Sequence, residues 1–179
     1  MLKAGSLAKV ALLLGLVQVP LAPLYAETFL TVEQARQALW ADVPMVPTDV
    51  VLSKAQMKAI AKASNVRVNR SRLKAWKTAD GGWFIIDQVV GKHEMIDMAV
   101  ALDTAGRVKG IEVLTYRETY GGEVKHPKWL AQFLGRGNEE YLQLDKQIKN
   151  ISGATLSCRH LTDGVNRWVH TWDQVLRHI

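Results

Sequence analysis

The sequence predicts an α+β fold in which helices flank a small antiparallel sheet, after an N-terminal signal segment. Runs rich in Val, Ile and aromatic residues, separated by short turns, occupy the middle of the chain. Segments with apolar residues at helical spacing lie before and after these runs. A short apolar stretch without acidic residues comes first in the chain. Together the three patterns indicate one modest domain behind a leader.

Residues 1–26 are typical of a secretory signal peptide. Lys3 and Lys9 precede an apolar stretch, no acidic residue occurs before Glu27, and the small Ala26 suits the position before the cut. The apolar stretch is short for a bilayer span, which needs ~20 residues. We therefore expect a periplasmic or otherwise extracytoplasmic protein, anchored to the inner membrane only if the segment is not cleaved.

Residues 27–78 are expected to form a helical lead segment in front of the main domain at residues 79–179. Thr31 can cap a helix that runs to Trp40, where two prolines follow, and a second helix is expected from Ser53. The basic residues of this segment are separated by residues of other types, so they are interpreted as a solvated face rather than a nucleic-acid site. They are Lys54, Lys58, Lys62, Arg67, Arg70, Arg72, Lys74 and Lys77.

An antiparallel meander is predicted for the middle of the chain. Turn signals such as Asp80-Gly81-Gly82 separate its strands. In the third strand, larger apolar residues alternate with Asp97, Ala99 and Ala101, so one face is expected to be core and the other small or covered. The expected strands are residues 73–76, 82–91, 94–102 and 108–116.

Two further helices are expected after the strands. A short one starts at His126-Pro127 and carries Trp129, and it ends at the glycines of residues 135–137. The loop at residues 150–157 then opens the last helix. Apolar residues at spacings of three and four give this helix one stripe, formed by Leu161, Val165, Trp168, Trp172, Val175, Leu176 and Ile179.

Composition excludes several classes of function. The net charge of +6 is spread along the chain without a nucleic-acid motif, so it is interpreted as a contribution to solubility and no nucleic-acid partner is expected. The single cysteine, Cys158, excludes a disulfide framework, a Cys-rich zinc site, a Cys-ligated iron–sulfur cluster and a CxxCH haem attachment, and it is expected to be a small buried side chain rather than a redox thiol. The histidines show no metal-ligand spacing, so no metal is assigned. Hydrolase, kinase and NAD(P)-binding motifs are absent from the sequence.

The S-G-A-T tetrapeptide at residues 152–155 resembles the flavinylation signature of the FMN-binding domain found in the flavin-bearing subunits of the sodium-translocating NADH:quinone oxidoreductase and the Rnf complex. The order of features over about residues 82–170 agrees with that family: a strand-turn-strand around residues 103–110, the run Glu118-Thr119-Tyr120-Gly121, a helix with Trp129, and the S-G-A-T loop opening a helix. The resemblance implies that Thr155 carries FMN through a phosphoester bond, installed after export by a dedicated flavin transferase.

Two positions depart from the family pattern. Lys149 stands where the preferred signature has an acidic residue, which would weaken recognition by the transferase, and the sequence leaves open whether it prevents covalent flavinylation. Tyr120 replaces the proline of the family's E-T-P-G loop, so this loop is less rigid or offers an aromatic face to the flavin ring. The flavin site is expected to survive this change.

Elementary chemistry supports a phosphoester at Thr155. A hydroxyl at a helix mouth lies beside backbone N–H groups and the positive end of the helix dipole, which offset the charge of a phosphate. Gly153 permits a positive φ in the turn, and the small Ala154 leaves room for the ribityl chain. The alternative is that Ser152 or Thr155 merely caps the last helix.

The resemblance and the loop chemistry together give a set of expected cofactor-binding residues. Tyr116, Tyr120 and Trp129 can wall the isoalloxazine ring or serve as ordinary packing, and Glu118 either contacts the flavin or forms a surface pair with Lys125 or Arg117. No catalytic residue is assigned. The expected cofactor-binding residues are Glu118, Thr119, Tyr120, Gly121, Trp129, Ser152, Gly153, Ala154, Thr155, Leu156 and Ser157.

The sequence therefore predicts an exported electron-transfer flavoprotein with FMN attached covalently to Thr155. It is expected to relay electrons between a membrane or periplasmic redox partner and another carrier or reductase, as a carrier more than a stand-alone enzyme. Two alternatives stay open: an FMN-dependent reductase of a small substrate, and a non-redox binding or assembly module that keeps the fold without flavin.

Overall fold

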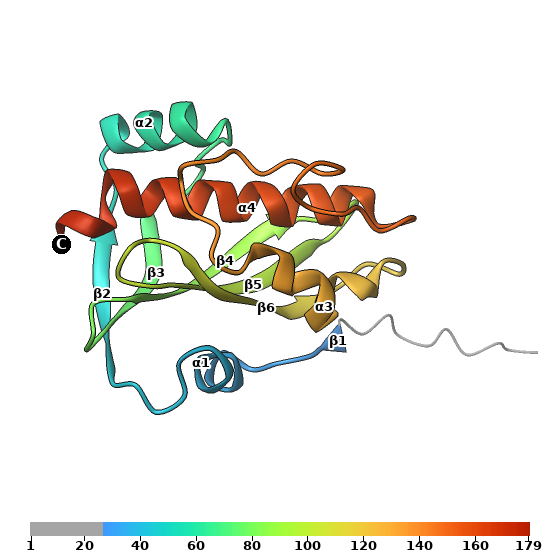
Figure 1. The fold of residues 1–179 in the computed structure, drawn as a ribbon, viewed down its shortest axis with the longest axis horizontal. Helices are drawn as coiled ribbons and strands as arrows, with labels where there is room; N and C mark the ends of the chain where they lie inside the picture. Colours follow the sequence, from blue (N-terminus) through green and yellow to red (C-terminus); the bar gives the residue numbers. More distant parts are fainter. Residues whose placement is uncertain (1–26) are drawn as a thin grey trace, which may run out of the picture.

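A six-stranded antiparallel sheet organises the protein, with strand order β1-β6-β5-β4-β3-β2 (Figure 1). The computed structural model describes residues 27–179, so the expected signal segment lies outside the described residues. The predicted meander is confirmed, because consecutive strands from β3 to β6 pair with each other. The strands are β1 (Glu27–Thr28), β2 (Met45–Val51), β3 (Arg72–Thr78), β4 (Trp83–Val90), β5 (Met95–Leu102) and β6 (Val108–Tyr116).

Strand β2 is a feature that sequence reasoning missed. The expected lead segment at residues 27–78 is not purely helical, since it also supplies β1, β2 and β3 to the sheet. Pro47 lies within β2, opposite Trp76 of β3. Because β2 is an edge strand, a residue without an N–H is tolerated there on the solvent side. The proposed boundary at residues 78 and 79 stays a prediction, although β3 and β4 pair across it.

The two helices of this segment are confirmed, and both begin where the sequence predicts. Helix α1 (Val32–Trp40) is capped by Thr31, and helix α2 (Lys54–Ser64) by Ser53. Each cap forms a capping box with a glutamine three residues later, in which the two residues exchange side-chain to backbone hydrogen bonds of 2.8–3.2 Å. These signals are local, which is why they can be read from the sequence.

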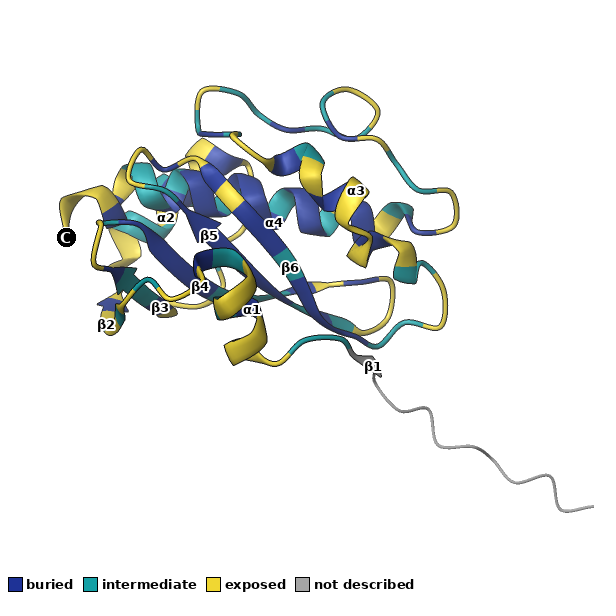
Figure 2. Cartoon of the chain, turned by 60° about the horizontal axis from the view of Figure 1, so that its bottom comes forward, coloured by how far each residue is buried: buried dark blue, intermediate teal, exposed yellow. Residues whose placement is uncertain are grey.

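Helices cover both faces of the sheet (Figures 1 and 2). Helix α4 (Thr155–Gln174) packs on β4 and β5, and α2 packs against α4, whereas α1 covers β5 and β6 from the other side. The predicted two faces of β5 are confirmed: its larger apolar residues belong to the core beneath α4, while Ala99 and Ala101 belong to a smaller cluster with Ala35 and Trp40 of α1. The small residues let α1 lie close to the sheet.

The C-terminal helix is shorter than the apolar stripe suggested. Helix α4 ends at Gln174, a 3₁₀ turn follows at Leu176–His178, and Ile179 is half exposed. Cys158 is fully buried, as predicted, and burial raises the pKa of its thiol. Within residues 27–179, no helix is long and apolar enough to cross a membrane.

Candidate functional site

Helix α4 begins at Thr155 without a side-chain cap. Ala154 occupies the N-cap position, and the first intrahelical hydrogen bond runs from the Cys158 N–H to the Ala154 carbonyl, at 2.9 Å. The N–H groups of residues 155–157 therefore have no acceptor within the helix. The interpretation in which Ser152 or Thr155 caps the helix is wrong. The mouth of α4 instead presents N–H donors and the positive end of the helix dipole, which together favour an anion.

The Thr155 hydroxyl is half-buried and has one polar neighbour, Asn150. The Nδ2 atom of Asn150 donates a hydrogen bond to Thr155 Oγ1 at 3.0 Å. The other end of the same amide, Oδ1, is buried and has no hydrogen-bond partner among the described residues. A buried acceptor without a donor is destabilising, so this oxygen is suited to a hydroxyl group of a bound molecule. Sequence reasoning gave Asn150 no role, because asparagine is common in loops for reasons of turn geometry alone.

The turn before Thr155 leaves space above Gly153. Its φ of +83° is in the left-handed region, as predicted, and a Cβ built on Gly153 would meet no atom within 4 Å. Ala154 has a different role from the predicted one. It is buried, with only 4% of its surface exposed, so the open space for a ligand chain lies over Gly153 and not over Ala154.

Ala154 lies against Gly121, from the loop that follows β6, and this close approach requires glycine at position 121. A Cβ built on Gly121 would lie 2.6 Å from the Ala154 Cβ and 2.8 Å from the Tyr116 hydroxyl. Tyr116 joins the two loops, because its hydroxyl donates to the Tyr120 carbonyl at 2.7 Å and lies 3.0 Å from Ser157 Oγ. Burial holds the pKa of Tyr116 above its ordinary value, so the hydroxyl stays protonated as a donor. The fold thus brings together the loop at residues 118–121 and the S-G-A-T turn at residues 152–155, the two loops on which the family resemblance rests.

Glu118 fixes the loop that follows β6 to the turn between β4 and β5. Its Oε1 accepts hydrogen bonds from the backbone N–H groups of His93, at 2.6 Å, and Glu94, at 3.0 Å. Burial alone would raise the pKa of Glu118, but these N–H groups and that of Lys92 lower it by more. Arg117, one of the two surface partners considered for Glu118, bonds to Asp97 and to the Met95 carbonyl instead. Glu118 therefore holds the loop after β6 against the β4–β5 turn.

Trp129 holds the backbone just before the S-G-A-T turn. It lies in the short helix α3 (Pro127–Leu130), which a 3₁₀ turn precedes at Gly122–Lys125 and another follows at Ala131–Phe133. Its indole N–H donates to the Lys149 carbonyl at 2.8 Å, and the Gln132 side chain accepts from the Lys149 N–H at 2.7 Å. Only 7% of Trp129 is exposed. Trp129 therefore positions the loop, and little of its ring is left to wall a flavin, while Lys149 itself is exposed.

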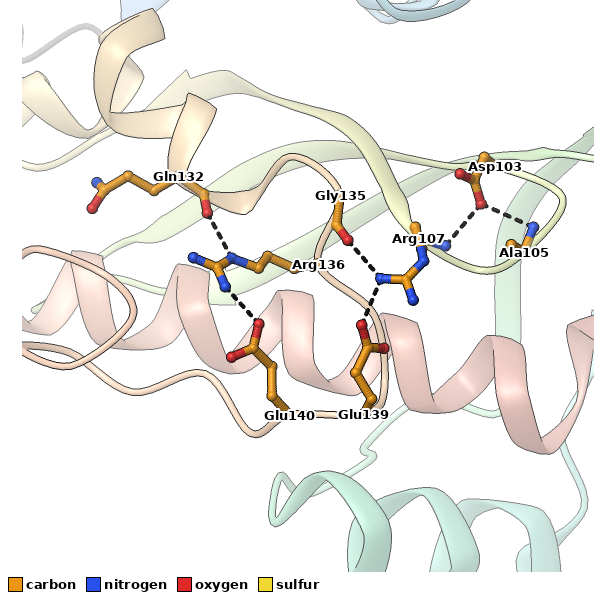
Figure 3. A network of polar contacts seen from close by, with 8 residues as sticks. All are labelled: Asp103, Ala105, Arg107, Gln132, Gly135, Arg136, Glu139 and Glu140. Carbon is orange, nitrogen blue, oxygen red and sulfur yellow. Dashed lines mark hydrogen bonds and ion pairs between the residues drawn. The ribbon is translucent and has the colours of Figure 1, made fainter.

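Arg107 attaches the long segment between α3 and α4 to the β5–β6 turn, and Arg136 makes contacts within the segment (Figure 3). Arg107, from the β5–β6 turn, donates to the Gly135 carbonyl at 2.9 Å and pairs with Glu139. Arg136 pairs with Glu140 and donates to the Gln132 carbonyl at 3.2 Å. The contacts of Arg107 therefore hold the segment at Gly135 and Glu139.

One buried side chain fixes the same segment to α4 directly. Asn166 is fully buried, and its amide oxygen accepts from the Leu142 N–H at 3.0 Å while its amide nitrogen donates to the Leu142 carbonyl at 2.9 Å. Both backbone groups of Leu142 are thus satisfied by one residue. The segment that delivers Asn150 to Thr155 is thus held at Leu142 as well as at Gly135 and Glu139.

Apolar surface is exposed around the site. Tyr120 is 81% exposed and Leu156 is 38% exposed, and both lie on the loops that meet at Gly121 and Ala154. A shallow depression of about 440 Å³ lies beside Tyr120, lined by residues 119–123, 125 and 126. Of the three aromatic residues expected to wall a ring, only Tyr120 presents its face to solvent, since Tyr116 is 5% exposed. Among the described residues, no group of three or more His, Cys, Asp and Glu side chains is placed to hold a metal ion.

Comparison with known families identifies this part of the chain. Residues 91–170 match the family model described as FMN-binding domain. The chain contains an FMN-binding domain. The match includes all of the expected site residues and Asn150, and it begins in the turn that Glu118 fixes. No curated protein matches the chain in a sequence comparison.

The residues of this FMN-binding domain suit the cofactor. The uncapped N-terminus of α4 suits a phosphate, the space over Gly153 gives a chain room to leave the surface, and the buried Asn150 Oδ1 can accept a hydrogen bond from a ribityl hydroxyl. The exposed Tyr120 and Leu156 offer apolar contact to a ring. Flavin binding is therefore the function that the domain supports.

Proposed function

We propose that this protein is an exported electron-transfer flavoprotein that carries FMN covalently, through a phosphoester to Thr155. One observation carries the proposal. The Thr155 hydroxyl lies at an uncapped helix N-terminus beside an open glycine turn, within a domain that matches the FMN-binding family. A hydroxyl in this position can be esterified while its phosphate is stabilised by the N–H groups of the first turn.

The proposed attachment needs a flavin transferase as maturation partner. Thr155 Oγ1 would form the bond to phosphorus and lose its proton, and the transferase would supply the FMN as a phosphoanhydride whose other half leaves. Asn150 orients Oγ1 through the 3.0 Å hydrogen bond from its Nδ2 atom. The Ser157 hydroxyl does not compete, because it is buried and directed at the Tyr116 hydroxyl. These contacts favour Thr155 over its nearest hydroxyl neighbour.

A tether has a physical purpose outside the cytosol. FMN that dissociated there would be diluted away, whereas attachment makes rebinding intramolecular, with a high effective concentration. FMN supplies one- and two-electron chemistry, so it can connect donors and acceptors that differ in the number of electrons they transfer. We infer that the protein relays electrons from a membrane or periplasmic redox partner to another carrier or reductase. The open depression beside Tyr120 supports this relay, because it leaves a face of the site accessible to a partner.

Mass spectrometry of the protein exported from a host that contains the flavin transferase tests the proposal. The intact mass should correspond to a chain starting at Glu27 with one FMN attached, and peptide mapping should place the adduct on Thr155. The variant Thr155→Ala should be folded and carry no covalent flavin, while the matched variant Ser157→Ala should keep the label. Lys149→Asp should keep or increase it, because the Lys149 side chain is exposed and only its backbone is held.

Four outcomes would contradict parts of the proposal. An adduct on another residue moves the site, and a folded, unmodified, colourless chain favours the non-redox module. Rapid oxidation of NADH by the purified holoprotein without a partner would favour a reductase over a carrier. A chain that still begins at Met1 would favour an anchor that is not cleaved.

A further inference from the structure

The sheet has a gap between β3 and β4, away from the flavin loops. The two strands pair only from Lys74 opposite Ile86 to Lys77 opposite Trp83, whereas β4 continues its pairing with β5 as far as Val90. Figure 1 shows β3 and β4 diverging from their common turn. Among the described residues, the β3 side of Asp87–Val90 therefore has no strand partner.

Ladder geometry shows which backbone groups face the gap. The Gly91 N–H donates to the Glu94 carbonyl at 2.6 Å, so this pair is a hydrogen-bonded one. Such pairs alternate along an antiparallel ladder, so Val89 bonds to β5 while Gln88 and Val90 direct their backbone groups toward the gap. The Val90 carbonyl is accordingly free of β5, and His160 of α4 bonds to it. The N–H and carbonyl of Gln88 and the N–H of Val90 are left to face the gap.

Two cavities meet at this gap. A cavity of about 510 Å³ lies on the α4 side of the sheet, and one of about 350 Å³ lies on the α1 side. Five residues line both cavities: Arg70, Lys74, Ile86, Asp87 and Gln88. The gap is therefore a slot through the sheet, with a cavity on each face.

The walls of the slot are apolar and its rim is basic. The larger cavity has apolar walls that include Val66, Leu73, Val89 and Trp168. Basic residues also line it, namely Arg67, Arg70, Arg72 and Lys74, of which Arg72 is already paired with Asp49. Asp87 and Asp163 also line it, and Asp87 is already paired with Arg167 and with the Trp168 indole N–H. In the smaller cavity Asp97 lies beside Arg70 and Lys74, and Asp97 is already paired with Arg117 and accepts a hydrogen bond from the Gln88 side chain. Arg70 crosses the slot, where it donates to the Gln88 side chain at 2.6 Å. An occupant should thus carry negative charge as well as apolar side chains.

We propose that an extended, acidic segment of a partner protein binds in this slot as an added strand beside β4. A strand directs successive side chains to opposite faces, and the slot has one cavity on each face to receive them. Apolar side chains would enter the larger cavity beneath α4, and acidic side chains would reach Arg70 and Lys74 on the other face. The backbone of the segment would bond to Gln88 and Val90. This surface lies on the opposite edge of β4 from its partner β5, and its binding does not depend on flavin.

A synthetic peptide of three Glu-Val repeats, with blocked ends, tests the proposal on the exported protein. Binding measured by fluorescence polarisation should be lost with a Lys-Val peptide of the same length. In hydrogen exchange followed by NMR, the peptide should protect the Gln88 and Val90 amides. Arg70→Glu should weaken binding by about tenfold or more, whereas Lys58→Glu, which reverses a charge on the exposed side of α2, should leave it unchanged.

A backbone variant separates strand addition from simple attraction between charges. Gln88→Pro removes the N–H that faces the slot and no bond to β5, so it should abolish protection at Val90 and weaken the binding of the peptide. If this variant does not fold, Arg70→Glu and the Lys-Val peptide still decide the question. The proposal would be overturned if the Glu-Val and Lys-Val peptides bind equally well. It would also be overturned if succinate protects the Gln88 and Val90 amides as well as the Glu-Val peptide does, or if these amides become protected without peptide as the protein concentration rises.

Discussion

Replacing Gly121 by alanine should separate the two loops that meet at the mouth of α4, and Gly135 provides a matched control. Both glycines have positive φ, +87° and +73°. Alanine in that conformation costs about 1 kcal/mol at either position, because its Cβ approaches the following carbonyl oxygen. A Cβ at Gly135 meets no atom within 4 Å, so we expect Gly135→Ala to reduce the free energy of unfolding by this amount alone.

The new methyl group of Gly121→Ala would lie 2.6 Å from the Ala154 Cβ and 2.8 Å from the Tyr116 hydroxyl. Contacts this short force one loop to move, and overpacking of this kind costs roughly 1–3 kcal/mol in addition to the backbone strain. The total is about 3 kcal/mol, which is about 2 kcal/mol more than for Gly135→Ala. The hydrogen bonds of Tyr116 to Tyr120 and Ser157 would be strained by the same movement.

Urea unfolding of the two variants measures this difference, provided that their m-values agree with that of the wild type. Circular dichroism before unfolding checks that the helices and the sheet are intact. If both variants lose the same free energy, the loop after β6 does not press against Ala154, and our account of how the two loops come together fails.

Two other predictions concern groups that position the site. Asn166→Ala should reduce the free energy of unfolding by about 2–4 kcal/mol in the same urea assay, since it leaves the buried N–H and carbonyl of Leu142 without partners; a loss below about 1 kcal/mol would show that this contact does not hold the segment. Glu118 has a pKa below its ordinary value of 4.5, so its charged form stabilises the fold above that pH and the stabilisation disappears as the pH falls through the lowered pKa. Glu118→Gln should therefore destabilise the protein at pH 7 and have progressively less effect below about pH 4.5, and a loss of stability that is the same at both pH values would contradict the assignment.

The sequence alone determined the elements whose signals are local. The capping boxes of α1 and α2 involve residues three apart, and the alternation along β5 shows which of its side chains share a face. The positive φ at Gly153 follows from the turn that it occupies. The order of motifs over about residues 82–170 was sufficient to indicate an FMN-binding domain, and the family model matches residues 91–170, because the family pattern is carried by residue types and their spacing.

Only the tertiary structure decided how distant residues act together. The approach of the two loops is what requires glycine at position 121, and Trp129 is buried and donates to the Lys149 carbonyl instead of being available to a ring. The strand around Pro47 forms because β3 provides a partner at the edge of the sheet, which no pattern within the strand reveals. The slot beside β4 exists because β3 leaves it after four paired residues. In each case the deciding energy comes from contacts between segments far apart in the chain, which local residue patterns do not encode.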